Sequence, residues 1–389
     1  MIYRDISSLI LEQSKLYPVI TLLGPRQSGK TTLVRSLFNH LPYRNLESPE
    51  TRALAEADPK KFLSESPQGL VIDEIQRLPS LLSYIQVLVD ERQTVGQFIL
   101  TGSHQLTLHQ SITQSLAGRT AILTLLPLGN SELQKANIQQ TLLSQMLKGG
   151  YPRLYDKGIS PSRAYADYLQ TYVERDVRLM VNIGNLQLFQ RFIKLCAGRV
   201  GQLLNLSSLC ADVGISVPTA KQWISILEAS YIIKLLPPYF ENFGKRYIKT
   251  PKLYFIDTGF LCYVLDIETE EQLDRDPLRG QIFENFVFSE LLKIRFNQGK
   301  AANLYFFRDS HGNEVDFLFK SANQFNVIEA KSSQTFNIDF LKGITYFKNL
   351  APGRVSKSFL IYSGNEATMV QNVQLLNAQS ISLSLLSDE

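Results

Sequence analysis

The stretch Gly24-Pro25-Arg26-Gln27-Ser28-Gly29-Lys30-Thr31 decides the fold of the first part of this chain. It matches the pattern G-x-x-x-x-G-K-[ST] at every position, between an apolar run at 19–23 and a helical stretch at 31–38. Its two glycines allow backbone N–H groups to close around phosphate oxygens at a helix N-terminus, which favours anions. The Lys30 ammonium can reach the β- and γ-phosphates, and the Thr31 hydroxyl can ligate Mg²⁺. We therefore expect these eight residues, together with Thr32, to bind ATP and Mg²⁺.

The sequence around this loop alternates short apolar runs with helical stretches. We predict buried strands at 20–23, 70–72, 98–100 and 121–126, with helices between them. This alternation is typical of a parallel sheet covered by helices on both faces. Gly149-Gly150-Tyr151-Pro152 interrupts the pattern. The sequence therefore predicts an α/β nucleotide-binding domain over residues 1–150.

Two carboxylates follow the apolar run at 70–72. A carboxylate that ends a strand beside a phosphate loop can hold Mg²⁺ through its waters, and we assign this role to Asp73. Glu74 points to the opposite side of the chain, so it is the better candidate for orienting the attacking water. The alternative is an ordinary pair of acids at a strand end, in solvent.

The next predicted strand ends in small polar residues, Thr101-Gly102-Ser103-His104. This resembles the sensor-1 position of AAA+-type ATPases, where a polar side chain contacts the γ-phosphate. Ser103 or His104 would have this role, and a polar cap on a strand end is the alternative.

Arg119 is a candidate arginine finger or cis sensor, because a guanidinium stabilises charge on a transferring phosphoryl group. A surface salt bridge is the alternative for Arg119. Three other arginines compete for the same role: Arg153, Arg175 and Arg178. Our catalytic assignments are thus Lys30, Glu74 and Arg119.

Residues 151–249 are mainly helical. A short helix at 207–213, a turn at Gly214, a second helix at 218–228 and a strand-like run at 231–239 resemble a winged helix-turn-helix. The outward side chains of the second helix would be Thr219, Lys221, Gln222 and Ser225, and Trp223 would lie in the core.

Only one of those outward residues is basic, whereas DNA-reading helices bring several cationic or amide side chains to phosphates and bases. A better basic patch lies downstream, at Lys245, Arg246, Lys249 and Lys252. The alternative to DNA binding is that this region packs against the nucleotide domain as a lid.

Residues 250–389 return to an α/β pattern. After a strand at 253–256, we predict a helix at 282–296, strands at 303–308, 314–320 and 326–330, a helix at 338–348 and a strand at 358–362. Asp316 and the pair Glu329 and Lys331, which share one face of a strand, resemble the D…(D/E)-x-K signature of restriction-endonuclease-like nucleases. Two carboxylates, Asp316 and Glu329, would bind Mg²⁺, and Lys331 would orient water.

Such nucleases often add an acid from a helix. Glu284 fits by resemblance, whereas Glu290 is the rival by geometry, because helical spacing places it on the apolar face. A carboxylate on that face needs a metal or a hydrogen-bond partner. The alternative for the whole cluster is that its charges serve structure or DNA contact alone.

Composition limits the remaining classes. The chain has 389 residues, of which 44% are apolar and 20% charged, and a net charge of +4, so it can build several cores and permits but does not require a nucleic-acid partner. The three cysteines form no metal-binding or disulfide pattern. Charges at Arg4 and Asp5 argue against a signal peptide, and no apolar run is long enough to span a membrane. We expect a cytoplasmic protein without membrane segments.

Taken together, these motifs resemble the bacterial and archaeal AAA-type ATP-binding family that carries a C-terminal domain of unknown function. The motifs that carry the resemblance are GPRQSGKTTL, LVIDEIQRLP, FILTGSHQL, SLAGRTA and LLPLGNSEL, followed by GGYPRLY, YVERDVR, LPPYFENFGKR, YFIDTGFL and FENFVFSELL. The resemblance implies a P-loop ATPase core, a winged-helix-like middle and a nuclease-like end.

The leading hypothesis is an Mg²⁺-dependent ATPase that acts on or with DNA, and whose oligomeric state is open. The alternative is an ATP-dependent switch that docks a protein partner and whose nuclease-like domain is inactive.

Overall fold

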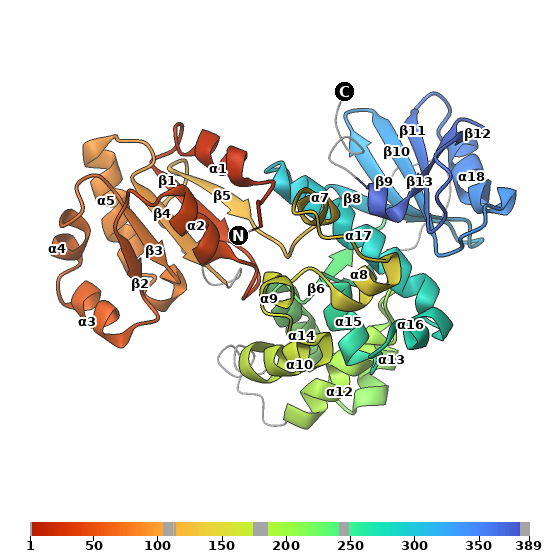
Figure 1. Cartoon of the computed structure of the whole chain (residues 1–389), viewed down its shortest axis with the longest axis horizontal. Helices are drawn as coiled ribbons and strands as arrows, with labels where there is room; N and C mark the ends of the chain where they lie inside the picture. The colour runs from red at the N-terminus through yellow and green to blue at the C-terminus, as the bar shows by residue number, and fades with distance from the viewer. Residues whose placement is uncertain (1, 104–111, 113, 174–185, 241–248, 382–389) are drawn as a thin grey trace. The chain divides into compact units, whose positions relative to one another are not determined.

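The computed structural model describes residues 2–103, 112, 114–173, 186–240 and 249–381 (Figure 1). Its contacts divide the chain into two compact units. The first contains residues 1–128, 229–231 and 296–300, and the second contains residues 129–228, 232–295 and 301–389. No helix among the described residues is long and apolar enough to cross a membrane.

The first unit is built on a five-stranded parallel sheet with the order β2-β3-β4-β1-β5. Its strands are β1 (Val19–Leu23), β2 (Tyr43–Asn45), β3 (Leu70–Asp73), β4 (Phe98–Gly102) and β5 (Thr120–Thr124). The predicted parallel sheet is confirmed. The edge strand β2 was not predicted, because its three residues are half-buried and carry no apolar run.

One helix of this unit precedes the first strand, and the others lie between successive strands, as β–α crossovers require. They are α1 (Ser7–Gln13), α2 (Lys30–Leu37), α3 (Pro49–Ala57), α4 (Pro59–Ser64), the 3₁₀ turn η1 (Ile75–Arg77) and α5 (Leu81–Arg92). Ile6, Ile10, Leu33 and Val34 pack against the buried side chains of β1 in one apolar cluster. This packing fixes α2 against the strand that precedes the phosphate loop.

The second unit begins with short helices: α7 (Asn130–Lys135), α8 (Leu142–Lys148), α9 (Pro152–Asp156), α10 (Pro161–Tyr168), the π-helical turn η2 (Leu169–Val173) and α12 (Leu186–Ala197). Helices α13 (Leu206–Val213) and α14 (Val217–Ala229) then precede an antiparallel pair, β6 (Ile233–Leu236) and β7 (Lys252–Phe255). The two predicted helices and their turn at Gly214, which has φ +86°, are confirmed.

Three of the four side chains of α14 predicted to point outward are exposed, whereas the fourth, Thr219, is half-buried. Lys221, Gln222 and Ser225 are exposed, whereas Trp223 is 5% exposed and packs edge-on against Phe189 and Phe192. Trp223 is therefore a core residue.

Two of the family-like motifs meet inside this unit. The Asp257 carboxylate accepts hydrogen bonds from the backbone N–H of Gly150 (2.7 Å) and Phe260 (2.9 Å) and from the Tyr165 hydroxyl (2.7 Å). A Cβ on Gly149 would lie 2.3 Å from the Asp257 carboxylate, so only glycine fits there. The paired glycines at 149–150 thus allow close approach of α8 to the start of α15 (Thr258–Val264).

The chain ends in a second sheet of mixed direction. After α16 (Glu270–Arg275) and α17 (Arg279–Asn297) come β8 (Leu304–Arg308), β9 (Glu314–Ser321), β10 (Gln324–Lys331), η3 (Ile338–Leu341), α18 (Lys342–Leu350), β11 (Val355–Tyr362), β12 (Met369–Val370), β13 (Val373–Asn377) and η4 (Ala378–Ser380). The sheet order is β12-β13-β11-β10-β9-β8. The predicted order α-β-β-β-α-β is confirmed, and the short strands β12 and β13 extend it.

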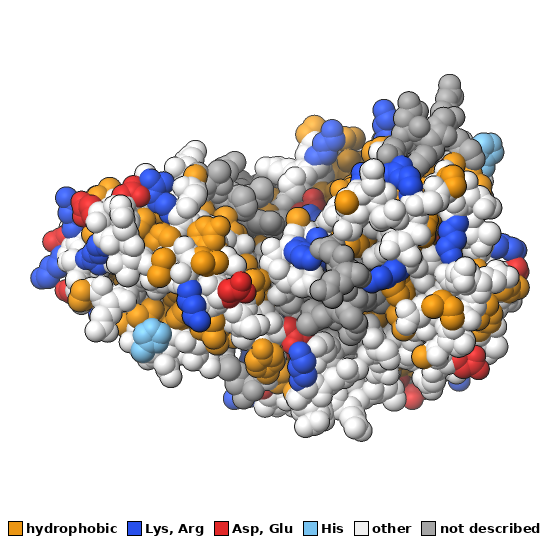
Figure 2. Space-filling model, turned by 90° about the horizontal axis from the view of Figure 1, so that it is seen from above, with side chains coloured by type: hydrophobic (Ala, Val, Ile, Leu, Met, Phe, Trp, Pro, Cys, Tyr) orange, Lys and Arg blue, Asp and Glu red, His pale blue; other side chains and the backbone are white. Residues whose placement is uncertain are grey.

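Charged side chains are dispersed over the surface. Figure 2 shows Lys and Arg interspersed with Asp and Glu on the visible face, without one continuous basic area. This distribution agrees with the small net charge of +4.

Candidate functional site

The phosphate loop runs from the end of β1 to the first turn of α2. Gly24 has φ +149°, and a Cβ there would lie 2.1 Å from the carbonyl oxygen of Leu125, while Gly29 has φ +95°. The ammonium of Lys30 donates to the carbonyl oxygens of Gly24 (2.9 Å) and Pro25 (2.7 Å). The loop therefore surrounds the ammonium group of its own lysine, which is the arrangement that an anion-binding loop requires.

The environment of Ser28, within this loop, supports the fit to phosphate. Its side chain is fully buried, and its hydroxyl has no hydrogen-bond partner among the described residues. A buried hydroxyl without a partner is costly unless a ligand satisfies it.

Arg4 stabilises the phosphate loop by hydrogen bonds to backbone carbonyl groups. Its guanidinium donates to the carbonyl oxygens of Ser28 (2.7 Å) and Leu126 (2.6 Å), and Arg4 is 5% exposed. The sequence did not indicate this role, because Arg4 lies 24 positions before Ser28.

The carboxylate of Asp73 lies at the end of β3, where side chains from α2, β2 and β4 contact it. Thr31 donates its hydroxyl to Asp73 Oδ2 at 2.9 Å, and Tyr43 donates to the same oxygen at 2.6 Å. Thr101 donates to the other oxygen, Oδ1. Asp73 and Thr101 meet because the carboxyl ends of the parallel strands β3 and β4 lie at the same edge of the sheet, and the first turn of α2 brings Thr31 to this edge. The two predicted metal ligands, Thr31 and Asp73, are thus adjacent oxygen donors, which suits Mg²⁺.

Tyr43 was not predicted. Burial and the hydrogen bond to Asp73 raise the pKa of its phenol, so Tyr43 remains a donor at neutral pH. Arg35 of α2 lies over the Tyr43 ring, 4.8 Å from its centroid.

Glu74 follows Asp73 directly, and its carboxylate has a different set of hydrogen-bond partners. Its backbone is left-handed (φ +59°), and its N–H donates to the Thr101 hydroxyl at 3.2 Å. Its carboxylate accepts from Ser103 (3.2 Å) and from the amide of Gln76. Ser103 is therefore next to Glu74, whereas His104 lies outside the described residues.

Arg119 lies away from this edge. It immediately precedes β5, whose first residue pairs with the first residue of β1, so it is at the amino edge of the sheet. A five-residue strand is about 16 Å long, which separates Arg119 from the phosphate loop. Its guanidinium forms a bidentate pair with Asp90 (2.6 and 2.8 Å). This geometry argues against a cis role and favours the salt-bridge alternative.

The remaining loop residues and arginines have separate positions. Arg26 forms an ion pair with Glu47 at 3.5 Å. Pro25 and Gln27 lie in the loop itself, and Thr32 lies in the first turn of α2. Arg153 lies in α9, in the second unit. Arg175, Arg178, Lys245 and Arg246 lie outside the described residues.

The four predicted nuclease-like residues lie in one group in the second unit. Lys331 donates to Glu329 at 2.8 Å and to Asp316 at 3.3 Å, and Asp316 also accepts from the Ala330 N–H at 2.9 Å. Burial raises the pKa of Glu329, and the neighbouring Asp316 raises it further. Burial and Asp316 likewise raise the pKa of Glu284, which places its carboxylate in the same electrostatic environment.

Lys252 corrects one sequence-based prediction. It was expected in an exposed basic patch, but its side chain is 3% exposed and its ammonium lies 2.9 Å from Glu284 and 2.5 Å from Glu314. Burial lowers the pKa of Lys252, yet the carboxylates of Glu284, Asp316 and Glu314 outweigh this effect and raise it. Tyr254, on the same strand, also donates to Glu284. Both residues were missed as parts of this cluster.

Among the described residues, no group of three or more His, Cys, Asp or Glu side chains is arranged to hold a metal ion. Lys252 and Lys331 each form ion pairs with two acids of this cluster.

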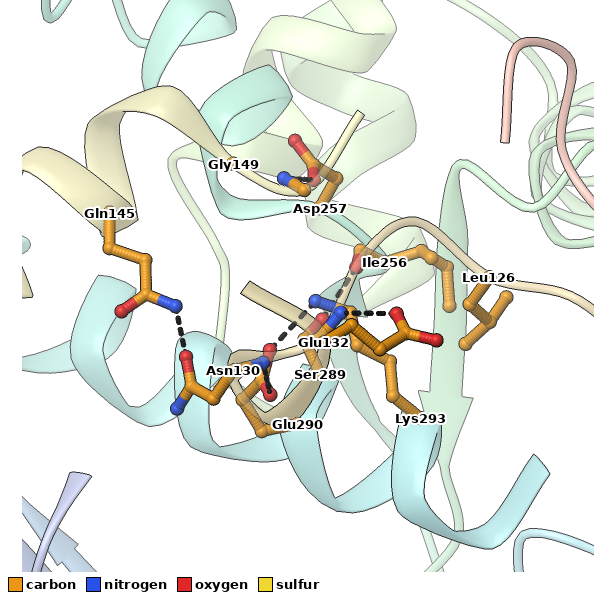
Figure 3. A network of polar contacts seen from close by, with 12 residues as sticks. Leu126, Asn130, Glu132, Gln145, Gly149, Ile256, Asp257, Ser289, Glu290 and Lys293 are labelled. Atoms are coloured by element: carbon orange, nitrogen blue, oxygen red, sulfur yellow. Dashed lines mark hydrogen bonds and ion pairs between the residues drawn. The ribbon is translucent and has the colours of Figure 1, made fainter. Parts of the chain in front are cut away.

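Glu290 has the hydrogen-bond partners that its buried position demands. It accepts from the Asn130 N–H at 2.8 Å and pairs with Lys293 at 2.7 Å (Figure 3). Its side chain therefore caps the start of α7, where Glu132 also accepts from the Gly129 N–H at 2.9 Å. Of the two helix acids, only Glu284 joins the nuclease-like group.

Three family models match the chain in succession. Residues 16–134 match an AAA domain, residues 139–271 a domain of unknown function (DUF8612), and residues 279–381 a second domain of unknown function (DUF4143).

Two curated relatives cover most of the chain. They are the uncharacterized proteins Rv2008c of Mycobacterium tuberculosis and Mb2031c of Mycobacterium bovis, each 30% identical over 341 residues, which is 86% of this chain and 75% of the relative.

Solved structures are more distant. A Walker-type ATPase of Pyrococcus abyssi aligns over 68% of this chain and 96% of its own, with 16% identity and a TM-score of 0.45. AMPPCP-bound DnaA from Aquifex aeolicus aligns over 57% of this chain and 85% of its own, with 13% identity and a TM-score of 0.28. The assignment of the fold therefore rests on the strand order and on the loop described above.

Proposed function

The chain belongs to the family of these mycobacterial proteins and carries an AAA domain, and from this premise we propose that it is an Mg²⁺-dependent ATPase that acts on or with DNA. One observation supports the ATPase more than any other. The loop that holds Lys30 lies beside the strand ends that carry Asp73, Glu74 and Ser103, with Thr31 and Asp73 in contact.

The roles of the residues follow from this arrangement. The loop N–H groups and Lys30 would bind the phosphates, with Lys30 exchanging its two carbonyl contacts for phosphate oxygens. Thr31 and Asp73 would hold Mg²⁺, which neutralises charge on the β- and γ-phosphates when bound. Glu74 would orient the attacking water, and Ser103 would contact the γ-phosphate. Residues 24–32 form the binding loop in this proposal.

The first experiment measures ATP turnover by the full chain with Mg²⁺, comparing the wild type with Lys30→Ala. We expect turnover to fall to background and nucleotide affinity to weaken. Lys60→Ala, an exposed lysine on α4, is the matched control. Unchanged turnover and binding in Lys30→Ala would disprove the proposal.

Action on DNA is supported by the exposed side chains of α14, at Lys221, Gln222 and Ser225, and by exposed Lys249. The same ATPase assay with added duplex and single-stranded DNA tests it. Turnover stimulated by DNA, and weakened in Lys221→Ala, would support a DNA-dependent motor. Slow turnover indifferent to DNA, with a stable protein partner, would support the switch. Assembly into a homo-oligomer is part of the motor proposal, with Arg119 or another arginine supplied in trans.

A nuclease in the C-terminal domain is the second candidate function. The observation that favours it is the grouping of Glu284, Asp316, Glu329 and Lys331, as in restriction-endonuclease-like enzymes, with Asp316 and Glu329 as Mg²⁺ ligands. Mg²⁺-dependent cleavage of DNA that is lost in Lys331→Ala would support it. No cleavage by either protein, with ATP still hydrolysed, would leave the group as a charge-neutralised structural cluster.

A further inference from the structure

Three side chains beside the phosphate loop form a closed set of hydrogen bonds. The Gln76 amide nitrogen donates to Glu74 Oε2 and to Ser103 Oγ, the latter at 3.0 Å. The Ser103 hydroxyl donates to the same Glu74 oxygen at 3.2 Å. Gln76 thus touches both residues that the proposed mechanism places around the γ-phosphate.

Every side-chain hydrogen of this triangle that Gln76 and Ser103 can donate is used within it. An amide nitrogen has two hydrogens, and a hydroxyl has one hydrogen and can also accept. Gln76 therefore donates one amide hydrogen to Glu74 and the other to Ser103, and Ser103 donates its hydroxyl hydrogen to Glu74. Two of these three bonds end on the same carboxylate oxygen of Glu74.

The backbone holds this triangle in place. Glu74 is left-handed, which is uncommon for a residue with a side chain and costs about 1 kcal/mol or more. Its N–H is held by Thr101, and its carbonyl oxygen accepts from Arg77 at 2.9 Å, closing the turn η1. This turn brings Gln76 back toward Glu74, two positions earlier in the chain.

From these contacts we propose that Gln76 is a positioning residue that orients Glu74 and couples it to Ser103. The inference rests on the proposed ATPase function. Two bonds occupy Glu74 Oε2, and no partner of its other oxygen is found among the described residues. The carboxylate therefore presents Oε1 to the attacking water.

Ser103 links this geometry to the nucleotide. Its hydroxyl has a single hydrogen, so donation to a γ-phosphate oxygen would withdraw the bond to Glu74. Gln76 would then be the one remaining group that holds the Glu74 carboxylate. The amide oxygen of Gln76 is buried and has no partner in the described part of the chain, so the two N–H bonds are the side-chain hydrogen bonds that hold Gln76 here.

The test is the pH dependence of ATP turnover in Gln76→Glu and Gln76→Leu. Both changes remove the amide donor, and Gln76→Glu keeps the length of the side chain. We expect kcat at pH 7.5 to fall at least tenfold in both, with KM for ATP changed less than threefold. A protonated carboxylic acid has one O–H donor. The ratio of Gln76→Glu to wild-type turnover should therefore rise as the pH falls from 7.5 to 5.5, whereas the ratio for Gln76→Leu should stay flat.

Gln86→Leu, a half-buried glutamine on α5, is the matched control and should behave as the wild type. The inference is overturned if Gln76→Glu and Gln76→Leu share one flat ratio, or if both match the control while the wild type hydrolyses ATP. A wild type without ATP turnover overturns the proposed function as well, so the two failures are distinguishable.

Discussion

Asp73 shows how much one carboxylate depends on residues far away in sequence. It accepts hydroxyl donors from Thr31, Tyr43 and Thr101, which belong to three different elements. A carboxylate with this many donors is fixed in direction, which a ligand of Mg²⁺ requires. The motif indicates Thr31 and Asp73, but nothing in the local sequence indicates Tyr43.

Tyr43→Phe tests this arrangement. The change removes one donor to Asp73 Oδ2 and leaves the ring and its contact with Arg35. We expect the Mg²⁺ concentration for half-maximal ATP turnover to rise by about three- to tenfold, because a lost hydrogen bond of this type is worth about 1 kcal/mol. Tyr84→Phe, at an exposed tyrosine of α5, is the control. Identical Mg²⁺ titrations for both variants would contradict the role of Tyr43.

At the scale of elements, polar side chains fix where helices and turns begin. Glu290 on α17 and Glu132 both accept from N–H groups at the start of α7. Asp309 organises the turn between β8 and β9, where it accepts from the N–H groups of His311 (2.9 Å) and Asn313 (3.0 Å).

Glu290→Gln isolates the charge at the first of these positions. The amide oxygen can still accept from the Asn130 N–H, but buried Lys293 loses its carboxylate partner. We expect the free energy of unfolding to fall by about 3 kcal/mol, because removing one charge of a buried ion pair is destabilising. Chemical denaturation measures it, with exposed Glu366→Gln as the control. A loss below about 1 kcal/mol would show that Lys293 is compensated elsewhere.

The environment of Asp309 predicts that the stability of the fold depends on pH. Burial alone would raise the pKa of this carboxyl, but hydrogen bonds from Tyr346, Asn313 and His311 outweigh burial and lower it to about 2. Because the folded pKa lies below the unfolded value of about 4, the stabilisation is present at neutral pH and is lost as the pH falls from about 4 toward 2.

Asp309→Asn should therefore cost about 2 kcal/mol at pH 7, and the difference from the wild type should shrink below pH 4. Urea denaturation at pH 7, 5, 4 and 3 measures this difference. Asp339→Asn, at an exposed aspartate, serves as the control. A difference that stays constant down to pH 3 would rule out the ionised Asp309 as its cause.

At the scale of the whole molecule, segments that are distant in sequence combine inside each unit. Lys252 belongs to β7, beside the helix–turn–helix, yet its ammonium lies among the carboxylates of Glu284 and Glu314 from the C-terminal segment. The match to DUF8612 includes Lys252, and the match to DUF4143 includes both acids. The two matched regions therefore share one electrostatic cluster.

Lys252→Met should destabilise the second unit by about 3 kcal/mol, because Glu284 loses its counter-charge while Tyr254 remains in contact. Thermal unfolding followed through the signal of the single tryptophan, Trp223, reports on this unit. Lys249→Met, at an exposed lysine nearby, is the control. Equal unfolding temperatures for both variants would mean that Lys252 contributes no net stabilisation.

The sequence by itself determined the elements whose signals are local. The phosphate loop, the buried strands of the first sheet, the helix–turn–helix and the order α-β-β-β-α-β all follow from glycine positions and apolar periodicity within short windows. It also predicted that Glu329 and Lys331 share a face, because alternate residues of a strand do, and that an adjacent strand brings Asp316 to the same side. Short strands such as β2 and β13 carried too little periodicity to be found.

Only the tertiary structure decided which side chains meet across elements. Tyr43, Gln76 and Arg4 join the nucleotide site through contacts that no spacing rule contains, because they come from the start of β2, from the turn η1 and from the segment before α1. Lys252 was predicted in a surface patch but lies in a buried cluster. Its charge can be buried there because nearby carboxylates offset the cost of removing it from water. Arg119 lies at the amino edge of the sheet. The direction of a strand decides at which edge its flanking residues lie, and a sequence motif does not specify that direction.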